Sequence, residues 1–379
     1  MNGTEVPFIL ERRMKKRRIT HVISDSNIGG AGVLLRSVAA SLNDEFDIEV
    51  LLPKGAGICS MLREGGIKLY ELPMQSDTSF NPRDTAAFRR LFSRHQTDVV
   101  HTHGALSARL GARLAGIGSC LSTRHCAIPL PNLSKKGYLK RKVYNYCTDL
   151  TVSTAEYATE NLVYEGIPRD RILTIKNGVA RRRRIDEAER SRLLAELNIP
   201  PGAVVIGSCA RLETVKGQDL IISALPRLIA AGFDVYLLLI GTGRAREALE
   251  RLCARLGILG RVKFTGFIDD PTSYQNLFQI NVNASRGTET SCLATSECMS
   301  LGIPTVASDF GGNTEMVFPG KNGLIFKSDN VFSLASELLK LIYDRHLYER
   351  LSAGAEEVYE SCFSIERMTA QYAQLYRSL

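Results

Sequence analysis

The sequence predicts an α/β protein with two doubly wound parallel sheets that face each other across a cleft. Short β-branched runs alternate with amphipathic, helix-length segments almost throughout the chain, which is typical of βαβ units. The alternation runs through two series, separated by a polar, arginine-rich stretch at 180–200. A length of 379 residues also exceeds what one hydrophobic core ordinarily supports, so we expect two domains.

Each candidate strand is a short run rich in β-branched residues, followed by a segment long enough for a helix. In the first half of the chain these runs lie at 19–24, 47–52, 68–72, 98–103, 120–124, 150–154 and 172–176. In the second half they lie at 203–210, 235–241, 262–267, 280–285, 304–309 and 323–326. Ligands of open α/β sheets bind outside the carboxyl ends of the strands, so side chains there are candidates for a site.

The domain boundary is expected within the arginine-rich stretch, and the last fifty residues are predicted to form helices. The segment "MKKRRITHVIS" from Met14 is typical of a natural start, so an unstructured extension is expected before it. The expected divisions are an extension at 1–14, a first domain at 15–185, a second domain at 186–360, and a final helix at 361–379 that packs back on the first domain.

Composition excludes several classes of protein. Apolar residues make up 44% of the chain and charged residues 23%, as in folded soluble proteins. The longest apolar runs are too short to span a bilayer, and the charged N-terminus lacks the apolar region of a secretory signal. Nine cysteines without a C-x-x-C pair fit a reduced chain better than a disulfide framework. We therefore expect a cytoplasmic protein.

Positive charge is concentrated in the first half of the chain. Residues 1–200 contain 31 of the 48 Lys and Arg but only 21 of the 40 Asp and Glu, with clusters at 14–18, 134–142 and 181–184. Such clusters could meet the phosphates of lipid headgroups or of an acidic substrate, or they could form an ordinary solvated surface. They lack interleaved aromatic residues and a reading motif, so we expect no nucleic-acid partner.

A glycine-rich turn, "DSNIGGAGVLL" at 25–35, directly follows the first predicted strand. Gly29 and Gly30 would let the backbone approach a ligand closely, and the following helix offers free N–H groups. The turn lacks the Lys-Ser/Thr ending of a P-loop and the spacing of a dinucleotide fingerprint. Alone, it fits a purely structural turn as well as a phosphate site.

Two histidines end consecutive predicted strands, His103 in "HTHG" and His125 in "STRH". Imidazoles at strand ends could hydrogen-bond the hydroxyls or phosphate of a substrate, and the alternative is a pair of satisfied core histidines. No further ligands occur at metal spacing, so the sequence predicts no metal site.

Two cations follow the first strand of the second half, in "CARLETVKGQD". Arg211 and Lys216 lie five residues apart across a turn, and a helix is predicted to begin after Gly217. A guanidinium fork and an ammonium point charge beside a helix N-terminus suit a diphosphate. The alternative is an exposed turn with ordinary surface charges.

The stretch "SRGTETSCLATSECMSLGIP" places two glutamates eight residues apart, Glu289 before a predicted helix at 292–301 and Glu297 on its mostly apolar body. Thr290 or Ser291 can cap this helix. A lone buried charge is costly, so Glu297 needs a partner or a function. Glu297 could accept hydrogen bonds from a diol such as ribose, and Glu289 could hold a sugar hydroxyl. The alternative is surface decoration.

Taken together, these motifs resemble those of glycosyltransferase family 4, retaining enzymes of the GT-B fold with two Rossmann-like halves. The resemblance covers about residues 15–379, and the joint occurrence of the motifs in this order is more specific than any one of them. The matching positions are "GGAG" with Gly29 and Gly30, "KNGV" at 176–179, Arg211, Lys216 and Gly217 in "ARLETVKG", and Glu289, Glu297, Met299, Gly302 and Pro304 in the E-x7-E signature.

The sequence departs from the family pattern at three places. At one of them Phe310 replaces the usual Asp or Val before Gly311 and Gly312, and the flexible glycine pair is kept. Thr290 and Ser291 replace the glycine and the aromatic residue that usually follow the first glutamate, where the backbone passes close to the donor sugar. Four arginines at 181–184 stand where the family usually shows an aspartate and a bulky residue. The resemblance therefore leaves the donor sugar open.

The resemblance implies transfer of a sugar from a UDP- or GDP-sugar to a lipid-linked, polysaccharide or other glycan acceptor, with retained configuration and without a cofactor or metal. The first domain would hold the acceptor, and its basic surface could rest on the anionic inner face of the cell membrane. The implied catalytic residues are His125, Glu289, Arg211 and Lys216. The implied donor-binding residues are Gly29, Gly30, His103, Arg211, Lys216, Glu289, Thr290, Ser291, Cys292, Leu293 and Glu297.

Two other functions remain compatible with these motifs. A nucleotide-sugar epimerase of the same fold would use carboxylates and a histidine on the sugar ring without any acceptor. A non-catalytic protein that binds a nucleotide sugar would explain the unusual Thr290. Isomerisation of a nucleotide sugar without acceptor would indicate the first, and the absence of any turnover would indicate the second.

Overall fold

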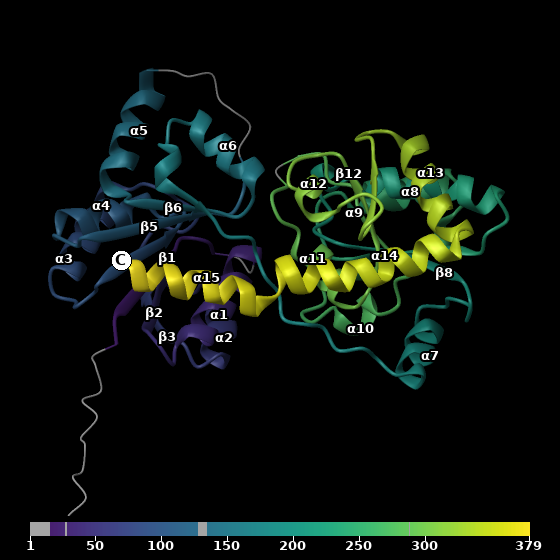
Figure 1. The fold of residues 1–379 in the computed structure, drawn as a ribbon, viewed down its shortest axis with the longest axis horizontal. Coiled ribbons are helices and arrows are strands. Elements are labelled where there is room, and N and C mark those ends of the chain that lie inside the picture. The colour runs from purple at the N-terminus through teal and green to yellow at the C-terminus, as the bar shows by residue number, and fades with distance from the viewer. Residues whose placement is uncertain (1–15, 27–28, 128–134, 288) are drawn as a thin grey trace, which may run out of the picture.

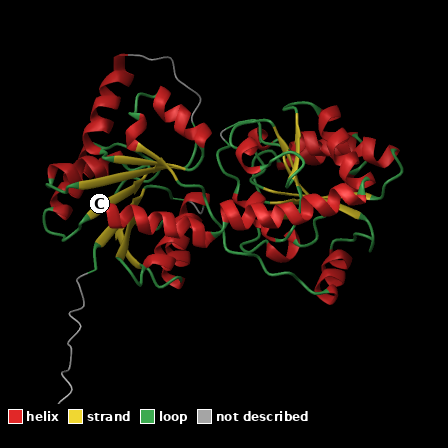
Figure 2. Ribbon diagram, viewed as in Figure 1, coloured by secondary structure: helices red, strands yellow, loops and turns green. Residues whose placement is uncertain are grey.

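The computed structural model describes residues 16–26, 29–127, 135–287 and 289–379. The chain forms two α/β lobes that lie side by side, and a helical segment near the C-terminus runs across both of them (Figure 1). In each lobe the strands lie inside and the helices lie around them (Figure 2). No described helix is both long and apolar enough to cross a bilayer. The extension expected at residues 1–14 lies outside the described residues.

The first lobe is built on one seven-stranded parallel sheet with the order β3-β2-β1-β4-β5-β6-β7. The strand order reverses between β1 and β4, which is the point where open α/β sheets bind ligands. Its strands are β1 (Arg18–Ile23), β2 (Asp47–Pro53), β3 (Lys68–Leu72), β4 (Val99–His103), β5 (Ser119–Arg124), β6 (Leu150–Ser153) and β7 (Ile172–Thr174). Its helices are α1 (Gly30–Leu42), α2 (Cys59–Glu64), α3 (Pro82–Phe92), α4 (Leu106–Leu114), α5 (Lys135–Cys147), α6 (Glu156–Tyr164) and the 3₁₀ turn η1 (Arg169–Arg171).

The second lobe repeats this plan with a six-stranded parallel sheet of order β10-β9-β8-β11-β12-β13, which reverses between β8 and β11. Its strands are β8 (Val204–Cys209), β9 (Val235–Ile240), β10 (Val262–Gly266), β11 (Ile280–Asn283), β12 (Thr305–Ser308) and β13 (Gly323–Phe326). Its helices are α7 (Glu187–Glu196), η2 (Thr214–Lys216), α8 (Gln218–Ala230), α9 (Arg246–Arg255), η3 (Leu259–Arg261), α10 (Thr272–Gln275), α11 (Leu293–Ser300), α12 (Asn313–Met316) and α13 (Val331–Tyr343).

Every predicted strand is present, with its ends within two residues of the predicted ones. Central strands of parallel sheets are covered on both faces and therefore appear as continuous apolar runs. The run "VYLLLI" of β9 shows this pattern and is almost entirely buried. The predicted fold class, two Rossmann-like domains, is confirmed.

Three final helical elements connect the two lobes: α14 (Arg345–Val358), a π-helical turn η4 (Tyr359–Phe363) and α15 (Ile365–Ser378). They form the yellow segment that crosses the molecule in Figure 1. At the crossing, the backbone N–H of Val179 donates to Phe363 at 2.9 Å, and that of Ile365 donates to Val179 at 3.0 Å. Helix α15 then packs against α1, and Tyr376 is fully buried in the core of the first lobe.

Candidate active site between the two domains

A small cavity lies at the carboxyl ends of β8 and β11 in the second domain. Its volume is about 10 Å³, and Lys216, Glu289 and Cys292 line it together with neighbouring strand residues. A cavity of this size holds at most about one water molecule. In the conformation that the structure describes, this cavity within the second domain therefore has no room for a substrate.

Lys216 and Glu289 form a nearly buried ion pair in this cavity, with 2.6 Å between Nζ and Oε2. The Ser285 hydroxyl donates a second hydrogen bond to the same carboxylate at 2.8 Å. The turn that carries Lys216 depends on Gly217, whose φ of 69° is left-handed and whose Cβ, if present, would overlap the carbonyl oxygen of Ala284. The sequence motif thus holds an ammonium against the loop that carries Glu289.

Arg211 lies in the same loop, directly after β8, but its position differs from that of Lys216. Its side chain is exposed, does not line the cavity, and makes no ion pair with another described residue. Its carbonyl oxygen accepts a hydrogen bond from the Gln218 side chain at 2.9 Å, which fixes the backbone of the loop. The structure therefore brings Lys216 and Glu289 together and leaves the Arg211 side chain exposed outside the cavity.

Glu297 has partners that the sequence reasoning did not identify. Its carboxylate forms an ion pair with Arg182 and accepts a hydrogen bond from Gln275 Nε2 at 2.7 Å. The side chain is 8% exposed, so these groups compensate a charge that burial would otherwise disfavour. The run of four arginines at the domain boundary was the signal that could have indicated Arg182, because a buried carboxylate needs a cation nearby.

The other members of that run pair within the chain as well. Arg181 pairs with Glu360, Arg183 with Glu189, and Arg184 with Glu356. These pairs tie the linker between the domains to α7, α14 and η4. The run at 181–184 is therefore neutralised by this protein's own carboxylates and offers little free charge to a partner.

The segment before α11 contacts the first domain directly. The Thr290 hydroxyl donates to the carbonyl oxygen of His125 at 2.9 Å, and a Cβ on Gly30 would lie 3.6 Å from Leu293. The predicted capping of α11 by Thr290 or Ser291 is wrong, because Cys292 occupies the cap position and no side chain accepts a hydrogen bond there. Thr290 instead bridges the domains.

The glycine-rich turn of the first domain lies opposite this segment. Gly29 precedes α1, Gly30 is its first residue, and both are exposed. No side chain caps α1, so its first N–H groups stay available to a ligand. A Cβ at Gly30 would make an ordinary van der Waals contact with Leu293, so the two domains approach each other here without requiring a glycine.

His103 is buried and His125 is partly buried, and Nδ1 of His103 lies 2.8 Å from Nε2 of His125. His103 also contacts His21, and burial lowers the pKa of all these imidazoles, to about 3 for His21 and to about 4 for His125. Nitrogens of His21, His101 and His103 lie within 4.8 Å of one another, a spacing that a metal ion could use.

The buried histidines predict acid sensitivity. A histidine with a depressed folded-state pKa stabilises the fold above its unfolded pKa of about 6.5, and this stability is lost as pH falls, by about 1.4 kcal/mol per pH unit and histidine. His21, His101, His103 and His125 all have lowered pKa values. We expect the free energy of unfolding, measured with urea, to fall steeply between pH 6.5 and 5. Replacing the exposed His346 by Gln should leave this pH dependence unchanged. A dependence that corresponds to the uptake of less than one proton on unfolding would contradict the prediction.

Two family models match the chain, one to each domain. The model described as Glycosyltransferase Family 4 matches residues 28–183, and the model described as Glycosyl transferases group 1 matches residues 189–358. The lipopolysaccharide core biosynthesis glycosyltransferase LpsE of Rhizobium meliloti is 29% identical over 242 residues, 64% of this chain and 68% of that protein. The alpha-D-kanosaminyltransferase of Streptomyces kanamyceticus is 28% identical over 195 residues, 51% of this chain and 50% of that protein.

Solved structures share the whole fold. Anabaena Alr3699/HepE, crystallised in complex with UDP, has a TM-score of 0.84 at 20% identity and covers 97% of this chain and 100% of its own. A glycosyltransferase from Rickettsia africae has a TM-score of 0.83 at 19% identity and covers 96% of this chain and 99% of its own. At such identities the likeness establishes the two-domain architecture.

Proposed function

We propose that this chain, which belongs to the glycosyltransferases of group 1 and family 4, transfers a sugar from a UDP- or GDP-sugar to a glycan or lipid-linked acceptor with retained anomeric configuration. The observation that carries the proposal is the Lys216–Glu289 pair, held in a cavity at the carboxyl ends of β8 and β11. The next residue, Thr290, contacts the His125 backbone of the other domain. Relatives named as glycosyltransferases support the reaction class, and the UDP complex of Anabaena HepE supports a nucleotide-sugar donor.

The leaving group of this reaction is a nucleoside diphosphate, whose β-phosphate gains negative charge as the glycosidic bond breaks. Fixed cations and oriented N–H groups at that position stabilise the transition state. Lys216 would supply the ammonium, and Arg211 would supply a guanidinium from the same loop. The start of α1 at Gly30 would supply backbone N–H groups. These cations would take the role that a metal ion has in other folds.

The remaining site residues suit the sugar and the ribose. Glu289 can exchange its bond to Lys216 for hydroxyls of the donor sugar, with Thr290, Ser291, Cys292 and Leu293 forming the adjacent wall. Glu297 and Arg182 form a polar pair one helix turn further along α11, where the carboxylate can accept from a ribose diol. A nucleotide sugar is far larger than the present cavity, so the loops and side chains that line it would have to rearrange to admit the donor.

Thermal shift with a panel of nucleotide sugars tests the donor half of this proposal. A ligand that binds only the folded state stabilises it by about 2.7 kcal/mol at a hundredfold excess over Kd. We expect one UDP- or GDP-sugar to raise Tm, and its sugar to appear on an added glycan or lipid-linked acceptor. A panel without any shift would contradict a nucleotide-sugar donor, whereas isomerisation of the sugar without acceptor would indicate an epimerase.

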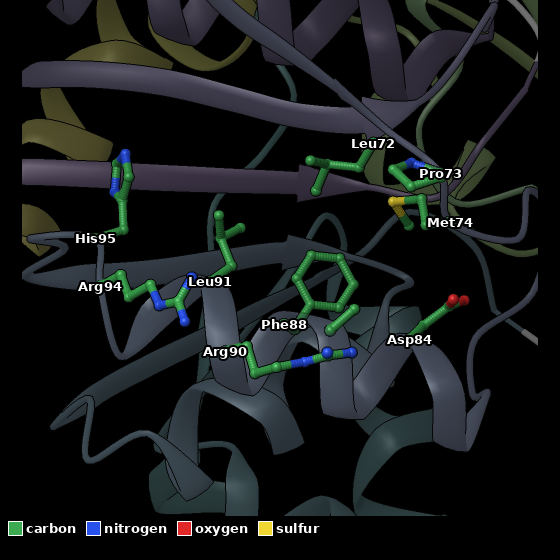
Figure 3. A pocket seen from close by; sticks show the side chains of 10 residues that line it. Leu72, Pro73, Met74, Asp84, Phe88, Arg90, Leu91, Arg94 and His95 are labelled. Atoms are coloured by element: carbon green, nitrogen blue, oxygen red, sulfur yellow. The ribbon is translucent and has the colours of Figure 1, made fainter.

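For the acceptor we propose the groove between β3 and α3 in the first domain (Figure 3). Its cavity volume is about 410 Å³, and its wall is mostly apolar, with Leu72, Met74 and Phe88 inside and Arg90 and Arg94 among the lining residues. Four exposed arginines lie on α3 or just after it, and none pairs with a carboxylate in the described part of the chain: Arg83, Arg89, Arg90 and Arg94. An anionic lipid-linked acceptor fits this combination of an apolar groove and free positive charge.

Vesicle sedimentation tests this surface. We expect the protein to sediment with phosphatidylglycerol vesicles and not with phosphatidylcholine vesicles, because exposed arginines near an anionic surface contribute about 1 kcal/mol each. The double variant Arg90→Ala/Arg94→Ala should lose most of this binding. The control Arg251→Ala/Arg255→Ala removes two exposed arginines at the same spacing on α9, of which Arg251 pairs with Glu247, and equal losses in both variants would contradict the proposed surface.

A further inference from the structure

Four histidines of the first domain, three of them buried and His125 partly buried, are joined by hydrogen bonds into one chain through the Tyr376 hydroxyl. His21 on β1 lies opposite His101 on β4 in the sheet, and His103 follows on the same face of β4. His21 Nδ1 lies 3.1 Å from His103 Nε2, and His103 Nδ1 lies 2.8 Å from His125 Nε2. The Tyr376 hydroxyl of α15 joins this chain to His101, lying 3.2 Å from His21 Nε2 and 2.8 Å from His101 Nδ1.

The rings meet edge to edge rather than face to face. The centroids of His21 and His103 are 5.4 Å apart with 17° between the ring planes, and those of His103 and His125 are 5.1 Å apart with 20°. Each centroid distance equals the N···N distance plus two ring radii, so the two nitrogens lie between nearly coplanar rings. This is the geometry of an N–H···N hydrogen bond. His101 directs its two nitrogens at the Tyr376 and Thr123 hydroxyls. The nitrogens of His21, His101 and His103 are therefore engaged with these partners and do not converge on a common metal position.

A chain of neutral imidazoles has a direction. Burial holds the pKa of each of these histidines well below 6.5, so near pH 7 every ring carries one N–H and one lone pair. If one ring donates forward, its neighbour must accept and then donate forward in turn. The proton position at one end of the chain therefore decides which nitrogen of the last ring, His125, carries the hydrogen.

The contacts of Tyr376 set that direction. Its hydroxyl has one proton for two imidazoles, and the shorter contact, to His101, is the one that suits an O–H donor. His101 then donates from Nε2 to the Thr123 hydroxyl at 2.7 Å, and His21 donates from Nε2 to the Tyr376 oxygen. His103 consequently donates to His21, and His125 donates to His103.

We infer that Tyr376, His21 and His103 are positioning residues that fix His125 as its Nε2–H tautomer and leave Nδ1 as a hydrogen-bond acceptor. In the described part of the chain, Nδ1 of His125 is buried and has no hydrogen-bond partner. The backbone of the same residue contacts Thr290 across the domain interface, so Nδ1 can accept from a hydroxyl of the bound sugar. Only the identity of that ligand rests on the proposed function.

Nitrogen NMR of the protein labelled with ¹⁵N-histidine tests the chain without any assay of activity. We expect His125, assigned by the loss of its signals in His125→Gln, to be a single Nε2–H tautomer in the wild type. Tyr376→Phe should leave both tautomers populated, because the group that sets the direction is gone. The control Tyr359→Phe also removes one buried hydroxyl, which donates to Val179 and takes no part in the histidine hydrogen bonds. It should leave the His125 signals unchanged.

Four results would overturn the inference: an Nδ1–H tautomer or an even mixture in the wild type, an unchanged His125 in folded Tyr376→Phe, or a bound metal ion that shifts the signals of His21, His101 and His103 together. The wild-type measurement does not depend on the folding of Tyr376→Phe. With a donor identified, Tyr376→Phe should raise its KM by about threefold to tenfold, the effect of one lost hydrogen bond, with little change in kcat. A changed His125 tautomer with an unchanged KM would show that His125 does not contact the donor. Absence of any glycosyl transfer would contradict the proposed function but not the tautomer of His125.

Discussion

Lys216→Ala is expected to lower glycosyl transfer about 10³-fold, the largest effect of any single substitution at this site. Among the described residues that line the cavity Lys216 is the one cation, and it lies 2.6 Å from Glu289. Its removal takes a fixed positive charge away from the place where the leaving diphosphate forms. It also leaves Glu289, which is 6% exposed, without its counter-charge, so the carboxylate would repel the donor phosphates.

The measurement is kcat/KM for the donor identified by thermal shift. Lys327→Ala is the control, because Lys327 is an exposed lysine of the same domain outside the cavity, and its loss should change kcat/KM by less than about twofold. Lys216→Arg should keep part of the rate, since the positive charge remains but the planar guanidinium differs in shape from the ammonium. Transfer by Lys216→Ala within tenfold of wild type would show that other groups stabilise the leaving group.

Gly312→Ala is expected to lower transfer about 10²-fold by displacing the loop that carries Glu289. Gly312 has a φ of −67°, which suits any residue, so the effect of alanine is purely steric. A Cβ there would overlap the carbonyl oxygen of Thr290, and the Gly312 N–H donates to the Glu289 carbonyl at 3.1 Å. One methyl group would thus push the backbone of both site residues away from their present positions.

Gly260→Ala is the matched control for this steric effect, because nothing lies within 4 Å of a Cβ at that glycine. We expect Gly260→Ala to retain activity and stability, and Gly312→Ala to lose activity together with about 1–3 kcal/mol of unfolding free energy. Kinetics and urea denaturation of the two variants give both quantities. Full activity of Gly312→Ala would show that the loop can move without cost to the site.

The sequence was sufficient to predict the fold because the information is local. Buried parallel strands such as β9 are continuous apolar runs, and the turns at Gly217 and Gly302 need left-handed glycines that mark the ends of elements. The strand limits differ by only one or two residues from the prediction. The capping of α11 was predicted wrongly because Thr290 satisfies a partner in the other domain, which no local pattern can indicate.

The candidate site was only partly predictable for the same reason. The loops that carry Lys216 and Glu289 have local signatures, and their convergence follows from the strand order of the second sheet. Arg182, which pairs with Glu297, lies 115 residues away in sequence, and Tyr376 lies 275 residues from His101. These pairs form only when the domains and α15 pack against one another. The spacing of residues within one segment therefore cannot predict them.

The position of α15 also bears on how the protein is made. Met368, Tyr372 and Tyr376 complete the core of the first lobe, yet the ribosome adds them only after the whole second sheet has been synthesised. Domains commonly fold in the order in which they emerge. Here the first lobe cannot complete its core until α15 has been synthesised, so part of its apolar surface stays exposed. The second lobe can complete its own core earlier. Nascent chains that stall before residue 365 should therefore bind chaperones through the earlier half of the molecule.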